Sequence, residues 1–226
     1  VLQGSNQIVH VLEPRTPLLI NRPALPEAGR TEPAAARQVS LAAGQPAARG
    51  DPERAAQMEW IRRSLLDAVT ADLRDQQPDV VFVPIGMGSG ISACATARAL
   101  TGVSTRIVGV VSAHATAYLD SFRDGRVVEA PTTTQLADGM ACRVPDAEAL
   151  GVIPREADDV VAVTDAEVAA AMRLLYTATH NVAEGAGAAS LAAAMQQRQR
   201  WQGKRIGVTL CGGNVDRDVF ARVLTG

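Results

Sequence analysis

Short apolar runs alternate with longer stretches of helical periodicity along the chain after residue 55. Met58, Ile61, Leu65, Val69 and Leu73 follow one another at steps of three and four residues, which predicts an amphipathic helix over residues 55–73. Buried strands are predicted where short runs are rich in Val and Ile, at residues 80–83, 106–111, 160–163 and 205–210. Further helices are predicted between or beside these runs, over residues 86–100, 115–122, 164–179 and 186–198.

The alternation of strands and helices predicts the α/β fold class, with an open, mostly parallel twisted sheet and helices on both faces. Thr164 and Glu167 have the spacing of a capping box, which marks the start of one of these helices. Ligands of such sheets bind at the carboxyl ends of the strands. Two glycine-containing loops occupy that location, at residues 86–90 and 211–214.

The first 54 residues differ from the rest of the chain in composition and in apolar periodicity. Seven of the 12 prolines lie within the first 52 residues, and residues 21–54 show no sustained apolar period. Such a segment buries too little apolar surface to offset its ordering entropy. We therefore expect an N-terminal segment over residues 1–20, a Pro/Ala-rich linker over residues 21–54 and an α/β domain over residues 55–226.

Composition excludes several classes of protein. With 226 residues, 47% hydrophobic and 20% charged, the chain is typical of a globular protein and not of a disordered or fibrous one. A net charge of -2 provides no field that would attract nucleic acid or an anionic membrane, and we find neither a membrane span nor a signal peptide. Three widely spaced cysteines favour a reducing compartment, so we expect a cytoplasmic protein.

The loop Gly86-Met87-Gly88-Ser89-Gly90 is the main candidate for ligand binding. Glycines between a buried strand and a helix let backbone N–H groups turn toward a ligand at the positive end of the helix dipole, which suits a phosphate. The alternative is a tight strand-to-helix turn without a ligand. The loop lacks the third glycine of the dinucleotide fingerprint and the Gly-Lys-Ser/Thr of a P-loop, and it does not match the nucleophile elbow.

Four motifs resemble, in order and spacing, the large-domain half of pyridoxal-phosphate (PLP) dependent threonine/serine dehydratases and serine racemases, whose fold is that of the tryptophan synthase β subunit. Residues 80–226, about two thirds of the chain, carry them, and residues 15–18 resemble the segment that opens such enzymes. The resemblance implies PLP as cofactor and an ammonia-lyase activity on a hydroxy amino acid. The motifs are Val83–Gly90, Leu136–Gly139, Val182–Ala189 and Leu210–Asp216.

The resemblance also implies roles for individual residues. The glycine loop stands where the family binds the PLP phosphate, and Cys211 stands where the family usually has a serine that faces the pyridine nitrogen. Glu184 stands at the carboxylate beside the cofactor ring, and Asp138 lies in the segment that borders the substrate. The alternatives are a small buried core thiol for Cys211 and ordinary helix-start or loop carboxylates for Glu184 and Asp138.

The sequence departs from the family in two respects. The Glu and Asp of the family's divalent-cation site are Val111 and Ala117 here, so we expect no metal site. The family's Schiff-base lysine lies in a small domain that would fall between residues 18 and 55, and its motifs are absent. The only lysine, Lys204, precedes Cys211 by seven residues on one predicted strand, roughly 23 Å at about 3.3 Å per residue and too far to reach the site. We expect the small domain to be absent or degenerate, through a deletion in the gene or an omission from this sequence.

Three hypotheses follow from these patterns. In the first, the intact protein is a PLP-dependent dehydratase of an amino acid such as L-threonine or L-serine, with a lysine that this chain lacks. In the second, the chain is a non-catalytic remnant that binds PLP or a phosphate ester. In the third, it is a phosphosugar- or nucleotide-binding module, although Thr105-Arg106-Ile107 stands where an acidic ribose-binding residue is expected. We expect a small-molecule partner and a homo-oligomer, most simply a dimer.

Overall fold

The computed structural model describes residues 8–12, 66 and 69–226. Five strands form one sheet in the order β1-β5-β2-β3-β4, in which β1 is antiparallel to β5 and the other neighbours are parallel. The predicted α/β class with a mostly parallel sheet is therefore confirmed. The strands are β1 (Ile8–Leu12), β2 (Val80–Pro84), β3 (Arg106–Ser112), β4 (Asp159–Val163) and β5 (Ile206–Leu210).

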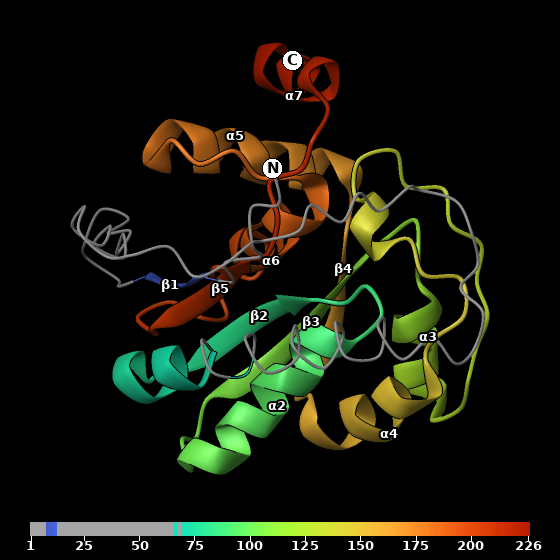
Figure 1. The fold of residues 1–226 in the computed structure, drawn as a ribbon, viewed down its shortest axis with the longest axis vertical. Coiled ribbons are helices and arrows are strands. Elements are labelled where there is room, and N and C mark those ends of the chain that lie inside the picture. The colour runs from blue at the N-terminus through green and yellow to red at the C-terminus, as the bar shows by residue number, and fades with distance from the viewer. Residues whose placement is uncertain (1–7, 13–65, 67–68) are drawn as a thin grey trace, which may run out of the picture.

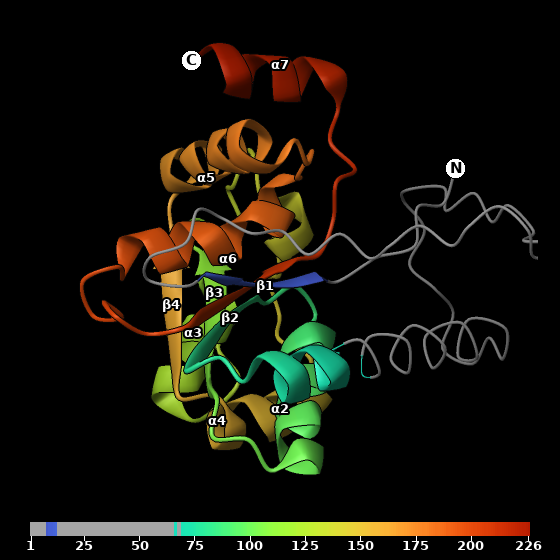
Figure 2. The same cartoon turned by 90° about the vertical axis from the view of Figure 1, so that its left-hand side faces the viewer.

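Helices cover both faces of the sheet, as predicted (Figures 1 and 2). On one side of the sheet α6 lies against the strands, with α5 packed on α6 and α7 packed on α5, and the other side carries α2, α3, α4 and a helix whose described part ends at residue 76. The helices are α2 (Ser89–Thr101), α3 (Ala117–Asp124), α4 (Ala147–Glu156), α5 (Asp165–Thr179), α6 (Gly185–Gln196) and α7 (Arg217–Thr225), with a 3-10 turn, η1 (Asp138–Met140).

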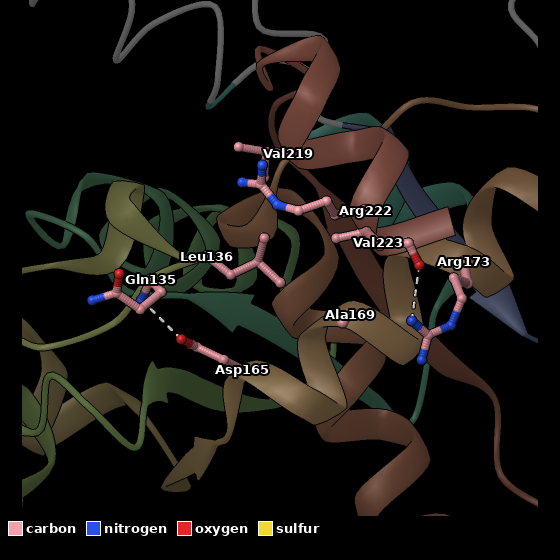
Figure 3. A pocket seen from close by; sticks show the side chains of 8 residues that line it. All are labelled: Gln135, Leu136, Asp165, Ala169, Arg173, Val219, Arg222 and Val223. Carbon is pink, nitrogen blue, oxygen red and sulfur yellow. Dashed lines mark hydrogen bonds between the residues drawn. The ribbon is translucent and has the colours of Figure 1, made fainter. Parts of the chain in front are cut away.

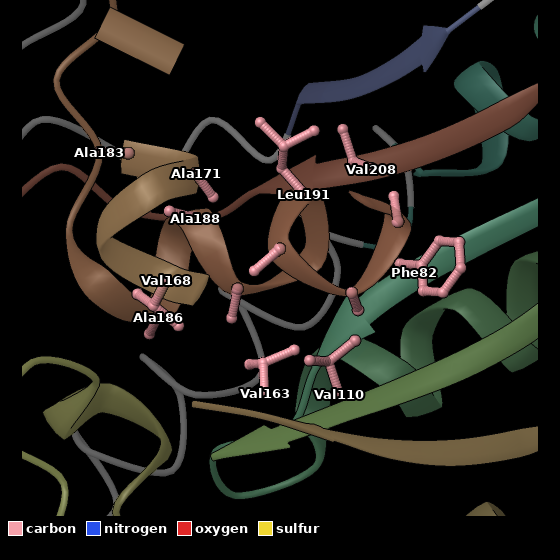
Figure 4. Packing of buried hydrophobic residues seen from close by; sticks show 14 of the residues in the cluster. Phe82, Val110, Val163, Val168, Ala171, Ala183, Ala186, Ala188, Leu191 and Val208 are labelled. Carbon is pink, nitrogen blue, oxygen red and sulfur yellow. The ribbon is translucent and has the colours of Figure 1, made fainter. Parts of the chain in front are cut away.

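The two cores arise from the alternation of side chains along the strands. Phe82 and Val110 point toward α6 and α5, whereas Val81 and Ile107 point toward α2 on the other face. Figure 4 shows the first of these cores, in which α6 lies against β2, β3 and β5. Because α6 is built largely of alanine and glycine, its backbone can approach the sheet closely.

Local sequence explains several helix ends. The Thr164 side chain accepts a hydrogen bond from the amide of Glu167, whose carboxylate in turn accepts one from the amide of Thr164, so the predicted capping box is present. The Asp146 side chain caps α4 by accepting from the amide of Ala149. Neither α4 nor α7 was predicted from the sequence. In α4, Gly151 and Pro154 disfavour a helix locally, but the cap and the burial of Ile153 stabilise it.

Parts of the sequence predictions lie outside the described residues. These are the linker over residues 21–54, the segment over residues 15–18 and most of the predicted helix over residues 55–73. The described part of that helix runs on to residue 76. Among the described residues, none of the helices is both long enough and apolar enough to cross a membrane.

Candidate functional site

The two predicted glycine loops follow the neighbouring strands β2 and β5. From these two strands the chain continues to opposite faces of the sheet. After β2 the chain enters α2 on one face, and after β5 it leads to α7 on the other (Figure 2). Residues Phe82 and Val208 are paired across β2 and β5, so Gly86 and Gly212 both lie four residues beyond a paired position. The loops therefore begin at the same level, at the place where parallel α/β sheets bind ligands.

The first loop turns sharply between β2 and α2. Gly88 precedes the first residue of α2 and has φ of 90°, a left-handed conformation that favours glycine. A Cβ on Gly86 would lie 2.5 Å from the carbonyl oxygen of Gly139, and one on Gly88 would overlap the Cβ of Ala149. These glycines allow the loop to pack closely against η1 and α4.

The backbone amides of the glycine loop are available to a ligand. Within the described part of the chain, no backbone carbonyl accepts a hydrogen bond from the amides of residues 86–91. The next amide, that of Ser92, donates to the carbonyl of Gly88. The first amides of a helix have no partner within that helix and lie at its positive end. Such a loop fits a phosphate group.

Glu184 connects the second loop to the rest of the site. The amide of Asn214 donates to Glu184 Oε2 at 3.2 Å, and the amide of Glu184 donates to the carbonyl of Gly212 at 3.0 Å. A Cβ on Gly212 would lie 2.5 Å from Glu184 Oε1, and one on Gly139 would lie 3.6 Å from the same atom. The structure thus brings the Asp138-Gly139 segment, Glu184 and the 211–214 loop together.

Small residues at the start of α6 make this arrangement possible. A Cβ on Gly185 would overlap the carbonyl of Leu136, and one on Gly187 would overlap the carbonyl of Gly212. Further along α6, the Ser190 hydroxyl donates to the carbonyl of Thr209 in β5 at 2.6 Å. The Ala-Gly pattern of α6 therefore lets one helix contact both loop segments through backbone atoms.

Burial and charge shift the protonation of two site residues. Burial raises the pKa of Glu184, and the nearby Asp138 carboxylate raises it further, against the hydrogen bond from Asn214. Burial raises the pKa of the Cys211 thiol to about 11, with a further contribution from the Glu184 carboxylate. Cys211 is therefore a neutral thiol at neutral pH, as expected for a group that does not hold a ring nitrogen protonated.

Lys204 lies at the other end of β5 from Cys211. It precedes the strand and its Nζ forms an ion pair with Asp79 Oδ1 at 3.4 Å, where both side chains are largely exposed. Lys204 is therefore a charged surface residue at the entrance to β5, far from Cys211 as the spacing predicted. The side chains at the two positions of the family's cation site, Val111 and Ala117, are buried hydrocarbons.

Sequence reasoning missed Tyr118, whose hydroxyl reaches the glycine loop. This side chain is 1% exposed, and its hydroxyl donates to the carbonyl of Met87 at 3.0 Å. Its position in an amphipathic helix, α3, predicts burial but not the contact with a loop 31 residues away. Met87 itself is 63% exposed, and its backbone carbonyl makes the contact.

A shallow hollow of about 300 Å³ lies between α5, α7 and the segment before η1 (Figure 3). Arg173 at its edge donates to the carbonyl of Val223, and Asp165 accepts from the amide of Gln135. These contacts join α5 to its neighbours and leave a mostly apolar surface. The hollow contains none of the site residues predicted from the sequence.

Comparison with known proteins identifies the family. The family model of the pyridoxal-phosphate dependent enzymes matches residues 28–212. The chain belongs to this family. Among curated relatives, an L-threonine ammonia-lyase from Geobacter sulfurreducens is 37% identical over 147 residues, which are 64% of this chain and 37% of that protein. A phenylserine dehydratase from Ralstonia pickettii is 35% identical over 147 residues, 65% of this chain and 45% of that protein.

Solved structures of amino-acid deaminases and racemases share this fold. Maize serine racemase superposes with a TM-score of 0.65 at 27% identity, covering 73% of this chain and 53% of that one. A threonine deaminase from T.th. superposes with a TM-score of 0.62 at 27% identity, covering 69% of this chain and 59% of that one. The family match favours PLP over the phosphosugar or nucleotide alternative. This chain spans less than half the length of the curated relatives described above.

Proposed function

We propose that this chain forms the PLP-binding half of an ammonia-lyase that converts a hydroxy amino acid, such as L-threonine or L-serine, into a 2-oxo acid and ammonia. The observation that carries the proposal is the set of glycine-loop amides that donate to no backbone group of the described residues, at the same level as the 211–214 loop and Glu184. Relatives named L-threonine ammonia-lyase and L-threo-3-hydroxyaspartate ammonia-lyase support the reaction class. We also propose a cytoplasmic homodimer.

In this proposal each group of residues has one task. The amides of the loop Gly86-Met87-Gly88-Ser89-Gly90 bind the phosphate, and the neutral Cys211 thiol faces the ring nitrogen. Glu184 lies beside the ring, and Asp138 borders the substrate. PLP, when bound, supplies an electron sink for the bonding electrons released at the substrate Cα. A neutral thiol at the ring nitrogen makes that sink weaker, which favours elimination over transamination.

The lyase proposal and its alternative differ in whether they need a catalytic lysine. PLP enzymes use a lysine amine both to hold the cofactor and to move protons, and Lys204 is paired with Asp79 at the far end of β5. The lyase proposal therefore requires a lysine from outside this chain. The same observation favours the alternative for the chain by itself, which is a protein that binds PLP or a phosphate ester without catalysis.

Two assays test the proposal. Equilibrium dialysis of the purified chain against PLP, with and without inorganic phosphate as competitor, tests the loop; binding that phosphate does not reduce would contradict its role. Formation of 2-oxo acids from L-serine and L-threonine is then measured with the full gene product that contains this chain. Phosphate-sensitive PLP binding without any 2-oxo acid would exclude the lyase and leave the non-catalytic alternative.

A further inference from the structure

The Tyr118 hydroxyl joins the glycine loop to the start of α4. It donates to the carbonyl of Met87 at 3.0 Å and accepts from the amide of Asp146 at 3.0 Å. Both partners are backbone groups on segments that meet only through tertiary packing. Asp146 in turn caps α4 through its side chain, and Ala149 of that helix lies against Gly88.

The direction of both hydrogen bonds follows from chemistry. A backbone N–H can only donate, so the bond from Asp146 uses a lone pair of the phenol oxygen. The single phenol hydrogen is then free to go to the Met87 carbonyl, which can only accept. Burial raises the pKa of Tyr118 to about 12, so the phenol retains this hydrogen across the neutral range.

A fixed Met87 carbonyl also fixes the next amide. The peptide unit is planar, and its C=O and N–H point in opposite directions. The hydrogen bond to Tyr118 therefore turns the N–H of Gly88 away from α3. No backbone group in the described ranges accepts a hydrogen bond from this N–H, and it stands at the start of α2.

We propose that Tyr118 is a positioning residue for the cofactor phosphate: it holds the Met87 carbonyl so that the amide of Gly88 is presented to the phosphate. This inference rests on the proposed function, because it assumes that the glycine loop receives the phosphate. Tyr118 itself does not touch the ligand. It acts on the one loop position where the backbone is left-handed, at φ of 90°.

The test compares Tyr118→Phe with Ser121→Ala. Phe keeps the buried ring and removes only the hydroxyl. Ser121 is a matched control, because it lies one turn further along α3, is 1% exposed and uses its hydroxyl for the backbone of Val128 instead of the loop. Dissociation constants for inorganic phosphate and for PLP are measured by isothermal titration calorimetry, below the unfolding temperature of each protein.

We expect Tyr118→Phe to bind both probes about tenfold more weakly, as for one misaligned hydrogen bond to a charged group. Ser121→Ala should bind like the wild type. Equal affinity of Tyr118→Phe and wild type, or equal weakening in both variants, would overturn the inference. If the wild type binds neither probe, the proposed function fails and the inference with it.

A second measurement starts from the wild type. In nitrogen-15 spectra, inorganic phosphate should shift the Gly88 amide more than amides at the far ends of the strands. In Tyr118→Phe that shift should shrink, whereas in Ser121→Ala it should persist. A Gly88 amide that does not respond to bound phosphate in the wild type would overturn the inference even if the affinities differ.

Discussion

Gly88 combines a left-handed backbone with close packing, and the two effects can be separated by mutation. In Gly88→Ala the alanine has to adopt φ of 90°, and its methyl overlaps the Cβ of Ala149. We expect the free energy of unfolding to fall by about 1–2 kcal/mol from the backbone and by roughly 1–3 kcal/mol more from the overlap. Urea denaturation measures the loss. Gly102→Ala, with φ of 68° and nothing within 4 Å, should show only the first part; equal losses would contradict the packing of α4 on the loop.

Glu184 should make stability depend on pH in a predictable direction. Its pKa is raised above the ordinary value of 4.5, so the folded protein binds the proton more tightly than the unfolded chain. The stability that such a group contributes is complete below its ordinary pKa and is lost as pH rises through the raised pKa of the folded state. Glu184→Gln removes this loss and can still accept the hydrogen bond from Asn214. We therefore expect the variant to gain stability relative to the wild type as pH rises above about 4.5, measured by urea denaturation at each pH.

Glu167→Gln is the control for this titration. Burial raises the pKa of Glu167, but hydrogen bonds from Thr164 and Gln196 outweigh burial and lower it below 4.5. A lowered pKa gives stability that is complete above the ordinary value and is lost only as pH falls through the lowered one. The difference between Glu167→Gln and the wild type should therefore stay constant between about pH 5 and pH 8. A constant difference for Glu184→Gln as well would contradict its raised pKa.

At the scale of elements, two helix glycines should respond in opposite ways to alanine. A methyl on Gly151 in α4 would meet nothing within 4 Å, whereas a methyl on Gly187 in α6 would overlap the carbonyl of Gly212. We expect Gly151→Ala to stabilise the protein by about 0.5–1 kcal/mol through helix propensity. Gly187→Ala should destabilise it despite the same gain in propensity, and thermal unfolding compares the two. Stabilisation by both would show that α6 does not need its close contact with the 211–214 loop.

The same elements show what sequence patterns can predict. The apolar run at residues 80–83 and the capping box at Thr164 are local signals, and both predictions are confirmed. The helix α4 depends on burial of Ile153 and on the Asp146 cap, which outweigh Gly151 and Pro154, so local propensity missed it. In the site, only the family resemblance assigned Glu184 and Cys211 to the cofactor, and the Tyr118–Met87 hydrogen bond is a tertiary contact with no local pattern.

At the scale of the whole molecule, the strand order decides where a ligand can bind. The sequence predicted parallel strands but not that β5 lies between β1 and β2, which brings the two loops to neighbouring strands. The same order places Lys204 at the opposite end of the sheet, because parallel neighbours start and finish together. This topology therefore places the two loops at one end of the sheet and Lys204 at the other.

This topology predicts that PLP binds the chain without a covalent bond to Lys204. The chain is incubated with PLP and reduced with borohydride, and its peptides are analysed by mass spectrometry. We expect no phosphate-sensitive adduct on Lys204, that is, no pyridoxyl group that inorganic phosphate prevents from forming. Lys204→Arg keeps the charge that pairs with Asp79 but removes the primary amine, so its affinity for PLP should equal that of the wild type. A phosphate-sensitive adduct on Lys204, together with weaker PLP binding by Lys204→Arg, would contradict the separation of the lysine from the glycine loop. Without such an adduct, any catalytic lysine must come from outside this chain, because Lys204 is its only lysine.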